Sequence, residues 1–297
     1  MGVVKPEQQN VRASSLGQRW LTALIAIPFV LFLCWFGGWG AFTAALLVVA
    51  LSSFEMHYML ANVGYRPLSV MSMGLSILFL ITAMLPSQMH LLVLEIGLGV
   101  ALLISFPWLF LRKSYDGVLV DWALTLVVPI YLAWPMSCAV LLRGYDPVLW
   151  HLASGGWIYL PPGAWWLLTA LVGVWVFDGA AFFSGRYFGR HKLAPLISPG
   201  KTWEGVIGGL VFCTIVCLVL TVVPLGISWY FAILLALLIG SAATLGDLAE
   251  SLIKRQTNVK DSGWMMPGHG GLLDRVDSLL FAFVVVYIFS QVMQLLK

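Results

Sequence analysis

The sequence predicts an all-α fold, a polytopic bundle of transmembrane helices. Of its 297 residues, 61% are hydrophobic and only 10% are charged, and the mean hydropathy is +0.95. A soluble core could not hide this much apolar surface, so the composition indicates a membrane protein. No polar stretch is long enough to fold alone, which favours one integrated bundle over separate soluble domains.

Nine apolar runs have the length expected of a spanning helix. They lie at about 20–36, 40–61, 68–85, 89–111, 117–142, 164–185, 203–223, 228–249 and 278–296. Residues 205–246 carry no charged or histidine side chain and are too long for one span, and Pro224-Leu-Gly226 is expected to divide them. The polar N-terminus imitates a signal peptide, but an uncleaved first helix is the better prediction.

The distribution of basic residues predicts the orientation. With nine spans and the N-terminus inside, fourteen of the 16 Lys and Arg residues fall on the cytoplasmic side, leaving Arg143 and Lys297 outside. We therefore expect residues 1–170 to form N-terminal transmembrane helices with little motif content. Residues 171–297 are expected to form a C-terminal catalytic transmembrane region that carries the polar cytosolic loops. The net charge of +3 and the absence of a basic–aromatic pattern exclude nucleic acid as a predicted partner.

The most polar stretch of the chain is 246–278. It holds five acids and four bases together with His269, although apolar sequence lies on both sides. Its charged residues are Asp247, Glu250, Lys254, Arg255, Lys260, Asp261, Asp274, Arg275 and Asp277. Juxtamembrane charges that only set topology would need neither the acids nor the Gly-rich segment, so a functional reading is favoured.

The spacing of these charges predicts two carboxylate faces. Asp247, Glu250 and Lys254 recur at i, i+3 and i+7 of one helix, and Asp274 and Asp277 recur at i and i+3 of the next. Two carboxylate faces joined by a basic, glycine-rich connection suit Mg²⁺ that holds a polyphosphate, because Mg²⁺ takes one or two carboxylates and leaves its other positions to water and phosphate. The lysines and arginines would meet the remaining phosphate charge.

A second polar constellation precedes this stretch. Asp178 is a carboxylate near the inner end of an apolar helix, which makes it a functional candidate. Ser198-Pro-Gly200-Lys201-Thr202 resembles a phosphate-binding loop, but the Walker pattern fails at Pro195 and no strand is expected before it. Gly200 and the amides that open the helix near Thr202 still predict an anion-binding nest, with Lys201 supplying charge.

Together these residues resemble a known family. Its signature is matched by Ser251-x-x-Lys254-Arg255, Lys260-Asp261, Pro267-Gly-His269-Gly270-Gly and Asp274-Arg275-x-Asp277. This pattern is similar to that of the phosphatidate cytidylyltransferases, the bacterial integral-membrane CDP-diacylglycerol synthases, and Ser198-Pro-x-Lys201-Thr202-x-Glu-Gly resembles the same family. The resemblance covers about residues 178–297.

The resemblance implies transfer of CMP from CTP to phosphatidic acid, giving CDP-diacylglycerol and pyrophosphate at the cytoplasmic face of the inner membrane. The expected Mg²⁺ ligands are Asp247, Asp274 and Asp277, and Lys254 and Lys201 join them as catalytic residues. The sequence leaves open a second cation such as K⁺ and a homodimer. The expected substrate-binding residues are Ser198, Gly200, Lys201, Thr202, Lys254, Arg255, Lys260, His269, Gly270, Arg275 and Asp178.

The sequence leaves rival functions open. A cation-coupled transporter would also use buried acids, but it has no need of a Gly-rich cytosolic loop between them. A CTP-dependent polyprenol kinase or another CDP-lipid synthase would share the chemistry and differ in the acceptor.

Among isolated acids, Glu55 and Asp121 could line the same cavity, whereas Glu95 is interpreted as structural or is left unexplained.

Overall fold

The computed structural model describes residues 32, 35–112, 115–144, 160–263 and 270–296. Its elements in chain order are α2 (Gly38–Asn62), α3 (Ser69–Thr82), α4 (Ser87–Phe110), α5 (Val118–Arg143), α7 (Pro162–Phe188), β1 (Lys192–Ala194), β2 (Ser198–Thr202), α8 (Trp203–Cys217), η1 (Leu218–Val222), α9 (Val223–Leu225), α10 (Trp229–Gln256) and α11 (Leu273–Leu295). The predicted helical fold is confirmed, with one short β-hairpin added.

Seven helices within the described ranges are long and apolar enough to cross a membrane. The segment 203–225, which joins α8, η1 and α9, counts as one of them. Helix α3 is apolar but has only 14 residues, about 21 Å of rise against a hydrocarbon core of about 30 Å. Most of the first predicted span, at 20–36, lies outside the described residues. The predicted division at Pro224–Gly226 is confirmed, because α9 ends at Leu225 and Gly226 adopts a left-handed φ of 66°.

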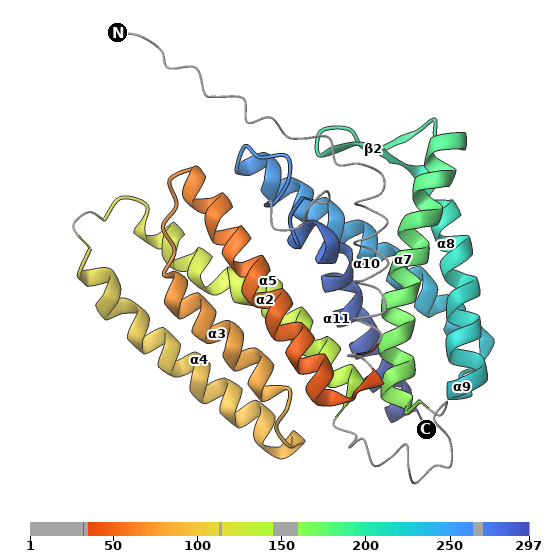
Figure 1. Ribbon diagram of the computed structural model, residues 1–297, viewed down its shortest axis with the longest axis horizontal. Helices are drawn as coiled ribbons and strands as arrows, with labels where there is room; N and C mark the ends of the chain where they lie inside the picture. The colour runs from red at the N-terminus through yellow and green to blue at the C-terminus, as the bar shows by residue number, and fades with distance from the viewer. Residues whose placement is uncertain (1–31, 33–34, 113–114, 145–159, 264–269, 297) are drawn as a thin grey trace.

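The helices form two packed groups that share α11 (Figure 1). Helices α2, α3 and α5 pack together, with α4 at the edge, and α7 packs along α8 and beside α10. Helix α11 contacts α2, α5, α7 and α10. Its inward positions are closed to solvent, among them Leu273, Leu280 and Val286. Helix α11 is therefore the central element, and Asp274 and Asp277 lie at its beginning.

Helix α4 is the least buried of the long helices. Its only buried residues are Ser105 and Leu109, and large apolar side chains such as Leu103 and Phe110 are exposed along it. In a bilayer, lipid would cover such a surface. Glu95 lies exposed on the same helix, which packs against α3 and α5.

Small residues bring α7 and α8 into close contact. A Cβ atom added at Gly208 would lie 2.1 Å from the Ser184 hydroxyl oxygen, and one at Gly205 would lie 2.8 Å from the Ala181 carbonyl oxygen. Such contacts are the usual way in which membrane helices approach closely. The close packing fixes the start of α8, and with it the hairpin that carries Lys201.

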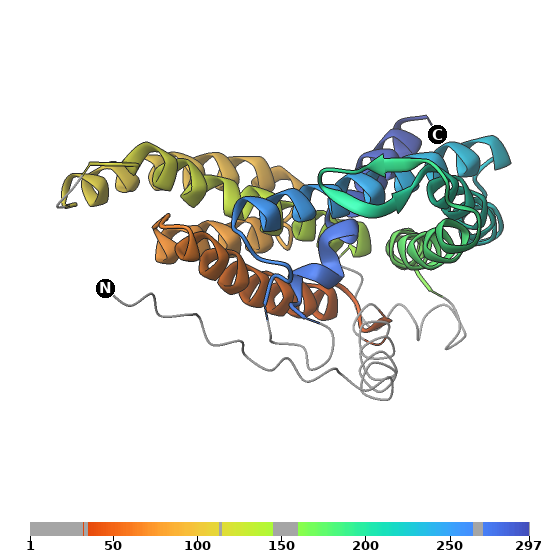
Figure 2. The same ribbon diagram turned by 90° about the horizontal axis from the view of Figure 1, so that it is seen from above.

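The segment 192–202 corrects the sequence prediction of a loop. Strands β1 and β2 pair antiparallel, with Lys192 opposite Thr202, and Figure 2 shows the hairpin from above. Glu204 holds its base by accepting hydrogen bonds from the backbone amides of Arg190 and His191 and from the His191 ring. The extended residues of β2 end at Thr202, the N-cap of α8, so the chain satisfies part of its backbone by pairing with itself.

Candidate functional site

The polar side chains of α10 form one face, as the spacing predicts. The Ser251 hydroxyl donates to Asp247 at 3.2 Å, and the Lys254 ammonium lies 2.7 Å from a Glu250 oxygen. Helix α10 continues to Gln256 before Asn258, with a left-handed φ of 57°, turns the chain away. Because the helix extends beyond its apolar run, these charges stand on a rigid element rather than in a loop.

Lys254 connects α10 to α11. Its ammonium lies 2.6 Å from Asp274 Oδ1 while it also contacts Glu250, and its side chain is only 15% exposed. Glu250 is buried, and its Oε1 atom has no hydrogen-bond partner among the described residues. The two predicted carboxylate faces therefore meet around a lysine at one end of the bundle.

Asp274 is held by donors from both ends of the Gly-rich connection. Its Oδ2 atom accepts hydrogen bonds from the Ser262 amide at 2.9 Å, the Ser262 hydroxyl at 3.0 Å and the Gly271 amide at 3.0 Å. With Oδ1 on Lys254, both carboxylate oxygens have protein partners. Asp274 therefore holds the two ends of the Gly-rich connection together, and it is also a candidate metal ligand.

The hairpin adds a second lysine to this cluster. Lys201 on β2 lies 2.7 Å from Asp247 Oδ2, which ties the hairpin to α10. Asp178 on α7 lies close enough to Asp247, Asp277 and Lys201 to interact with them electrostatically. The structure therefore brings together the two polar constellations, which begin at Asp178 and Gly246 in the sequence.

Asp277 lies where α10 and α11 cross. Its Oδ1 atom accepts from the Ser278 amide at 2.7 Å, and its backbone carbonyl lies 2.4 Å from the position a Cβ of Gly246 would take. Asp277 also lies close enough to Asp247 for the two carboxylates to repel each other. The glycine beside Asp247 permits this close approach.

The other predicted site residues are placed less centrally. Thr202 is buried and accepts from the Gly205 amide as the N-cap of α8, and the Trp203 amide donates to the His191 carbonyl, so part of the expected anion nest is already occupied. Arg255 donates to the Ile197 carbonyl at 3.4 Å. His269 lies outside the described residues. Gly270 lies beside the cluster, because a Cβ added there would lie 3.0 Å from Asp274 Oδ2. Arg275 is exposed in the first turn of α11. Among the described residues, Ser198, Gly200 and Lys260 make no hydrogen bond or ion pair with the cluster.

Of the two isolated acids expected near the site, only Glu55 joins the cluster. Glu55 on α2 contacts Ser262, Leu272 and Leu273. Asp121 instead pairs with Arg112 and accepts from the Arg66 amide at 2.7 Å, so it connects the α2–α3 loop to α5. The expectation for Asp121 is wrong because its position at the start of α5 directs it to these local partners.

The cluster suits a hard cation by charge, although its ligands are not gathered around one point. Six carboxylates, those of Glu55, Asp178, Asp247, Glu250, Asp274 and Asp277, are accompanied by the ammonium groups of Lys201 and Lys254. Uncompensated buried negative charge is costly, and a divalent cation would offset it. Within the described ranges, no three acidic, histidine or cysteine side chains are arranged to hold a metal. A cation here would therefore use one or two carboxylates and complete its shell with water or phosphate oxygens.

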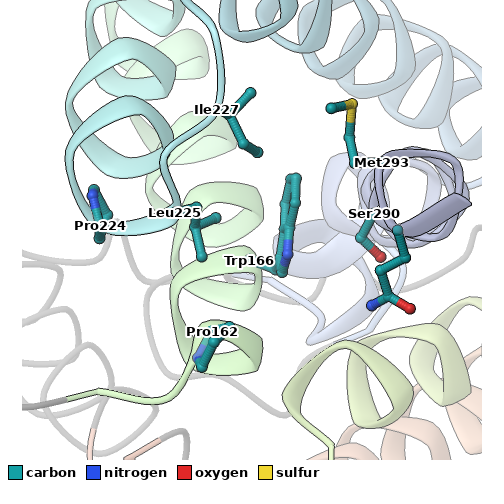
Figure 3. A pocket seen from close by; sticks show the side chains of 8 residues that line it. Pro162, Trp166, Pro224, Leu225, Ile227, Ser290 and Met293 are labelled. Carbon is teal, nitrogen blue, oxygen red and sulfur yellow. The ribbon is translucent and has the colours of Figure 1, made fainter. Parts of the chain in front are cut away.

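An apolar cavity lies at the end of the bundle away from the carboxylate cluster, and Figure 3 shows the side chains that line it. It measures about 180 Å³ and is lined by side chains such as Trp166, Ile227 and Met293. Its walls come from the beginning of α7, the α9–α10 connection and the end of α11. It holds no charged side chain and is separate from the carboxylate cluster.

Comparison with known proteins identifies the family. The chain matches the model of the cytidylyltransferase family over residues 17–293. A phosphatidate cytidylyltransferase from Brucella melitensis is 34% identical over 283 residues, covering 94% of each chain. One from Synechocystis is 34% identical over 294 residues, covering 92% of this chain and 95% of the relative. One from Haemophilus influenzae is 45% identical over 127 residues, which is 43% of that protein. The match over nearly the full length shows that this chain belongs to the phosphatidate cytidylyltransferase family.

Proposed function

We propose that the carboxylate–lysine cluster of α2, α7, β2, α10 and α11 is the active site at which this integral membrane protein makes CDP-diacylglycerol. The chain is a phosphatidate cytidylyltransferase, a nucleotidyltransferase of phospholipid biosynthesis. The observation that supports the site is Lys254, which contacts Glu250 on α10 and Asp274 on α11 at the same time.

The reaction needs no protein nucleophile. An anionic phosphate oxygen of phosphatidate attacks the α-phosphorus of CTP, the bond between this phosphorus and the β-bridging oxygen breaks, and pyrophosphate leaves with the electron pair. Such transfers depend mainly on positioning and on neutralising charge. The lipid phosphate is already ionised near neutral pH, so a general base is not required.

One or two of the carboxylates of Asp247, Asp274 and Asp277 would hold Mg²⁺, and water or phosphate oxygens would complete its shell. When bound, this ion supplies positive charge to the phosphate oxygens and orients them. For Asp274 to act as a ligand, Lys254 must exchange a carboxylate for a phosphate oxygen, and Lys201 must do the same at Asp247. Both lysines are thus placed to move from an internal ion pair to the substrate. Arg255, Lys260, Arg275 and His269 remain candidates for the other phosphate contacts.

We also propose that the cluster faces the cytoplasm, where CTP is available, and that the lipid chains enter from the bilayer between helices. The basic residues that flank the cluster support this orientation through the positive-inside bias. The near full-length relatives come from bacteria, which supports placing this protein in the cytoplasmic membrane.

Purified protein with CTP and Mg²⁺ tests the acceptor. Phosphatidate, a polyprenyl phosphate, a polyprenol and diacylglycerol would each be offered, and pyrophosphate and CDP would be measured separately. Pyrophosphate release with phosphatidate alone is the expected result. A CTP-dependent kinase would instead release CDP with the polyprenol, and nucleotide-independent ion flux in proteoliposomes would indicate a transporter.

Removing the hairpin lysine should weaken CTP binding more than turnover. Lys201→Ala leaves Asp247 without its cation, and we expect the KM for CTP to rise about tenfold, as for loss of one charged phosphate contact. Lys192→Ala, an exposed lysine on the paired strand, is the matched control. An unchanged KM for CTP in Lys201→Ala would make the contact with Asp247 purely structural.

A further inference from the structure

We propose that Glu55, on α2, is a positioning residue of the active site. It fixes both ends of the Gly-rich connection and the start of α11. The role rests on the proposed active site, because it concerns the placement of Asp274 and Asp277. Glu55 lies more than two hundred residues from its partners in the sequence. It stands in the N-terminal part of the chain, which carries no recognisable motif.

The hydrogen bonds of Glu55 define what it holds. Its Oε1 atom accepts from the Leu272 amide at 2.9 Å, and its Oε2 atom accepts from the Leu273 amide at 2.9 Å. The first amides of a helix lack partners within the helix, and a carboxylate at this end is also favoured by the helix dipole. Glu55 therefore supplies from another helix the cap that the sequence around Leu272 lacks.

Glu55 also reaches the other end of the connection. The Ser262 hydroxyl lies 3.1 Å from Glu55 Oε2 and 3.0 Å from Asp274 Oδ2. A hydroxyl has one proton, so it donates to one of these carboxylates at a time. Ser262 consequently links the positioning residue directly to a candidate metal ligand.

Two glycines make room for this arrangement. A Cβ atom at Gly263 would lie 2.6 Å from Glu55 Oε1, and one at Gly271 would lie 2.6 Å from Glu55 Oε2. Only glycine allows the backbone to approach the carboxylate this closely. The Gly-rich sequence is thus required in part by a carboxylate from α2, and not only by a ligand.

The same contacts exclude one mode of substrate binding. The amides of Leu272 and Leu273 are bonded to Glu55, and the Gly271 amide is bonded to Asp274. A helix N-terminus often binds phosphate through such amides. At α11 they are already occupied by the protein's own carboxylates, which assigns the triphosphate to the lysines and arginines.

Glu55→Gln tests the inference while keeping the size of the side chain. One glutamine oxygen can accept one backbone amide, but its NH₂ group would face the other amide, donor against donor. We expect kcat/KM for CTP to fall about 10²-fold, as for a displacement of about 1 Å at a catalytic group. Glu95→Gln, at an exposed glutamate on α4, is the matched control and should match the unchanged protein.

Hydrogen–deuterium exchange of peptides covering residues 270–275 gives a readout that does not depend on activity. In the unchanged protein these amides should exchange slowly, and in Glu55→Gln they should exchange faster while peptides from α8 stay the same. Fast exchange in the unchanged protein would overturn the proposal even if the variant failed to fold. Faster exchange in the variant with normal kcat/KM would overturn the link to catalysis. Absence of CTP-dependent activity in the unchanged protein would count against the proposed function. The hydrogen–deuterium exchange result does not depend on activity, so the two failures can be told apart.

Discussion

Asp274→Asn is expected to abolish CDP-diacylglycerol synthesis, with a loss of about 10³-fold or more, as for removal of a group that stabilises developing charge. Asparagine keeps the shape of the side chain but removes the charge that Lys254 meets at 2.6 Å. It also places an NH₂ group where one carboxylate oxygen now accepts either from Lys254 or from the Ser262 and Gly271 amides.

Initial rates of pyrophosphate release, with thermal unfolding of the detergent-purified protein, would measure this effect. The variant should still insert and purify, because the buried surface of α11 is unchanged. Asp116→Asn, at an exposed residue between α4 and α5, serves as the control for the same chemical change. Near-normal turnover in Asp274→Asn would remove Asp274 from the proposed metal ligands.

Gly246→Ala should impair the enzyme by separating α10 from α11. The added Cβ would lie 2.4 Å from the Asp277 carbonyl oxygen and 3.1 Å from the Ser278 Cα, and neither backbone atom can rotate away. We expect the helices to move apart, with a loss of about 1–3 kcal/mol in the free energy of unfolding from overpacking. Turnover should fall about 10²-fold, because Asp247 and Asp277 stand on opposite sides of this contact.

The comparison of Gly246→Ala with Gly74→Ala isolates the effect of the crossing. Gly74 lies inside α3, and a Cβ there meets no other atom within 4 Å. Alanine is also the better helix former, so the control should be as stable as the unchanged protein or slightly more stable. Equal activity and melting temperature in the two variants would show that the close crossing of α10 and α11 is not needed.

The predicted face of Asp247, Glu250 and Lys254 follows from local rules alone. The period of an α-helix places these residues together whatever packs around them, and the structure confirms it through the contacts of Lys254 with Glu250 and of Ser251 with Asp247. The break at Gly226 is equally local, because proline and glycine limit the backbone at that point. The β-hairpin does not follow from the sequence pattern, because strands of three and five residues are too short to show a clear alternation of polar and apolar side chains.

Composition and helical periodicity are enough to predict a helical membrane protein and the residues that share each helix face, and the motifs are enough to indicate its family. Three contacts become visible only in the folded chain: Lys201 pairs with Asp247, Asp121 pairs with Arg112, and Glu55 caps α11. The physical reason is that helix periodicity acts over a few residues. Contacts between residues 55 and 272 depend instead on how whole helices pack, and a single carboxylate in an apolar run does not reveal its partner.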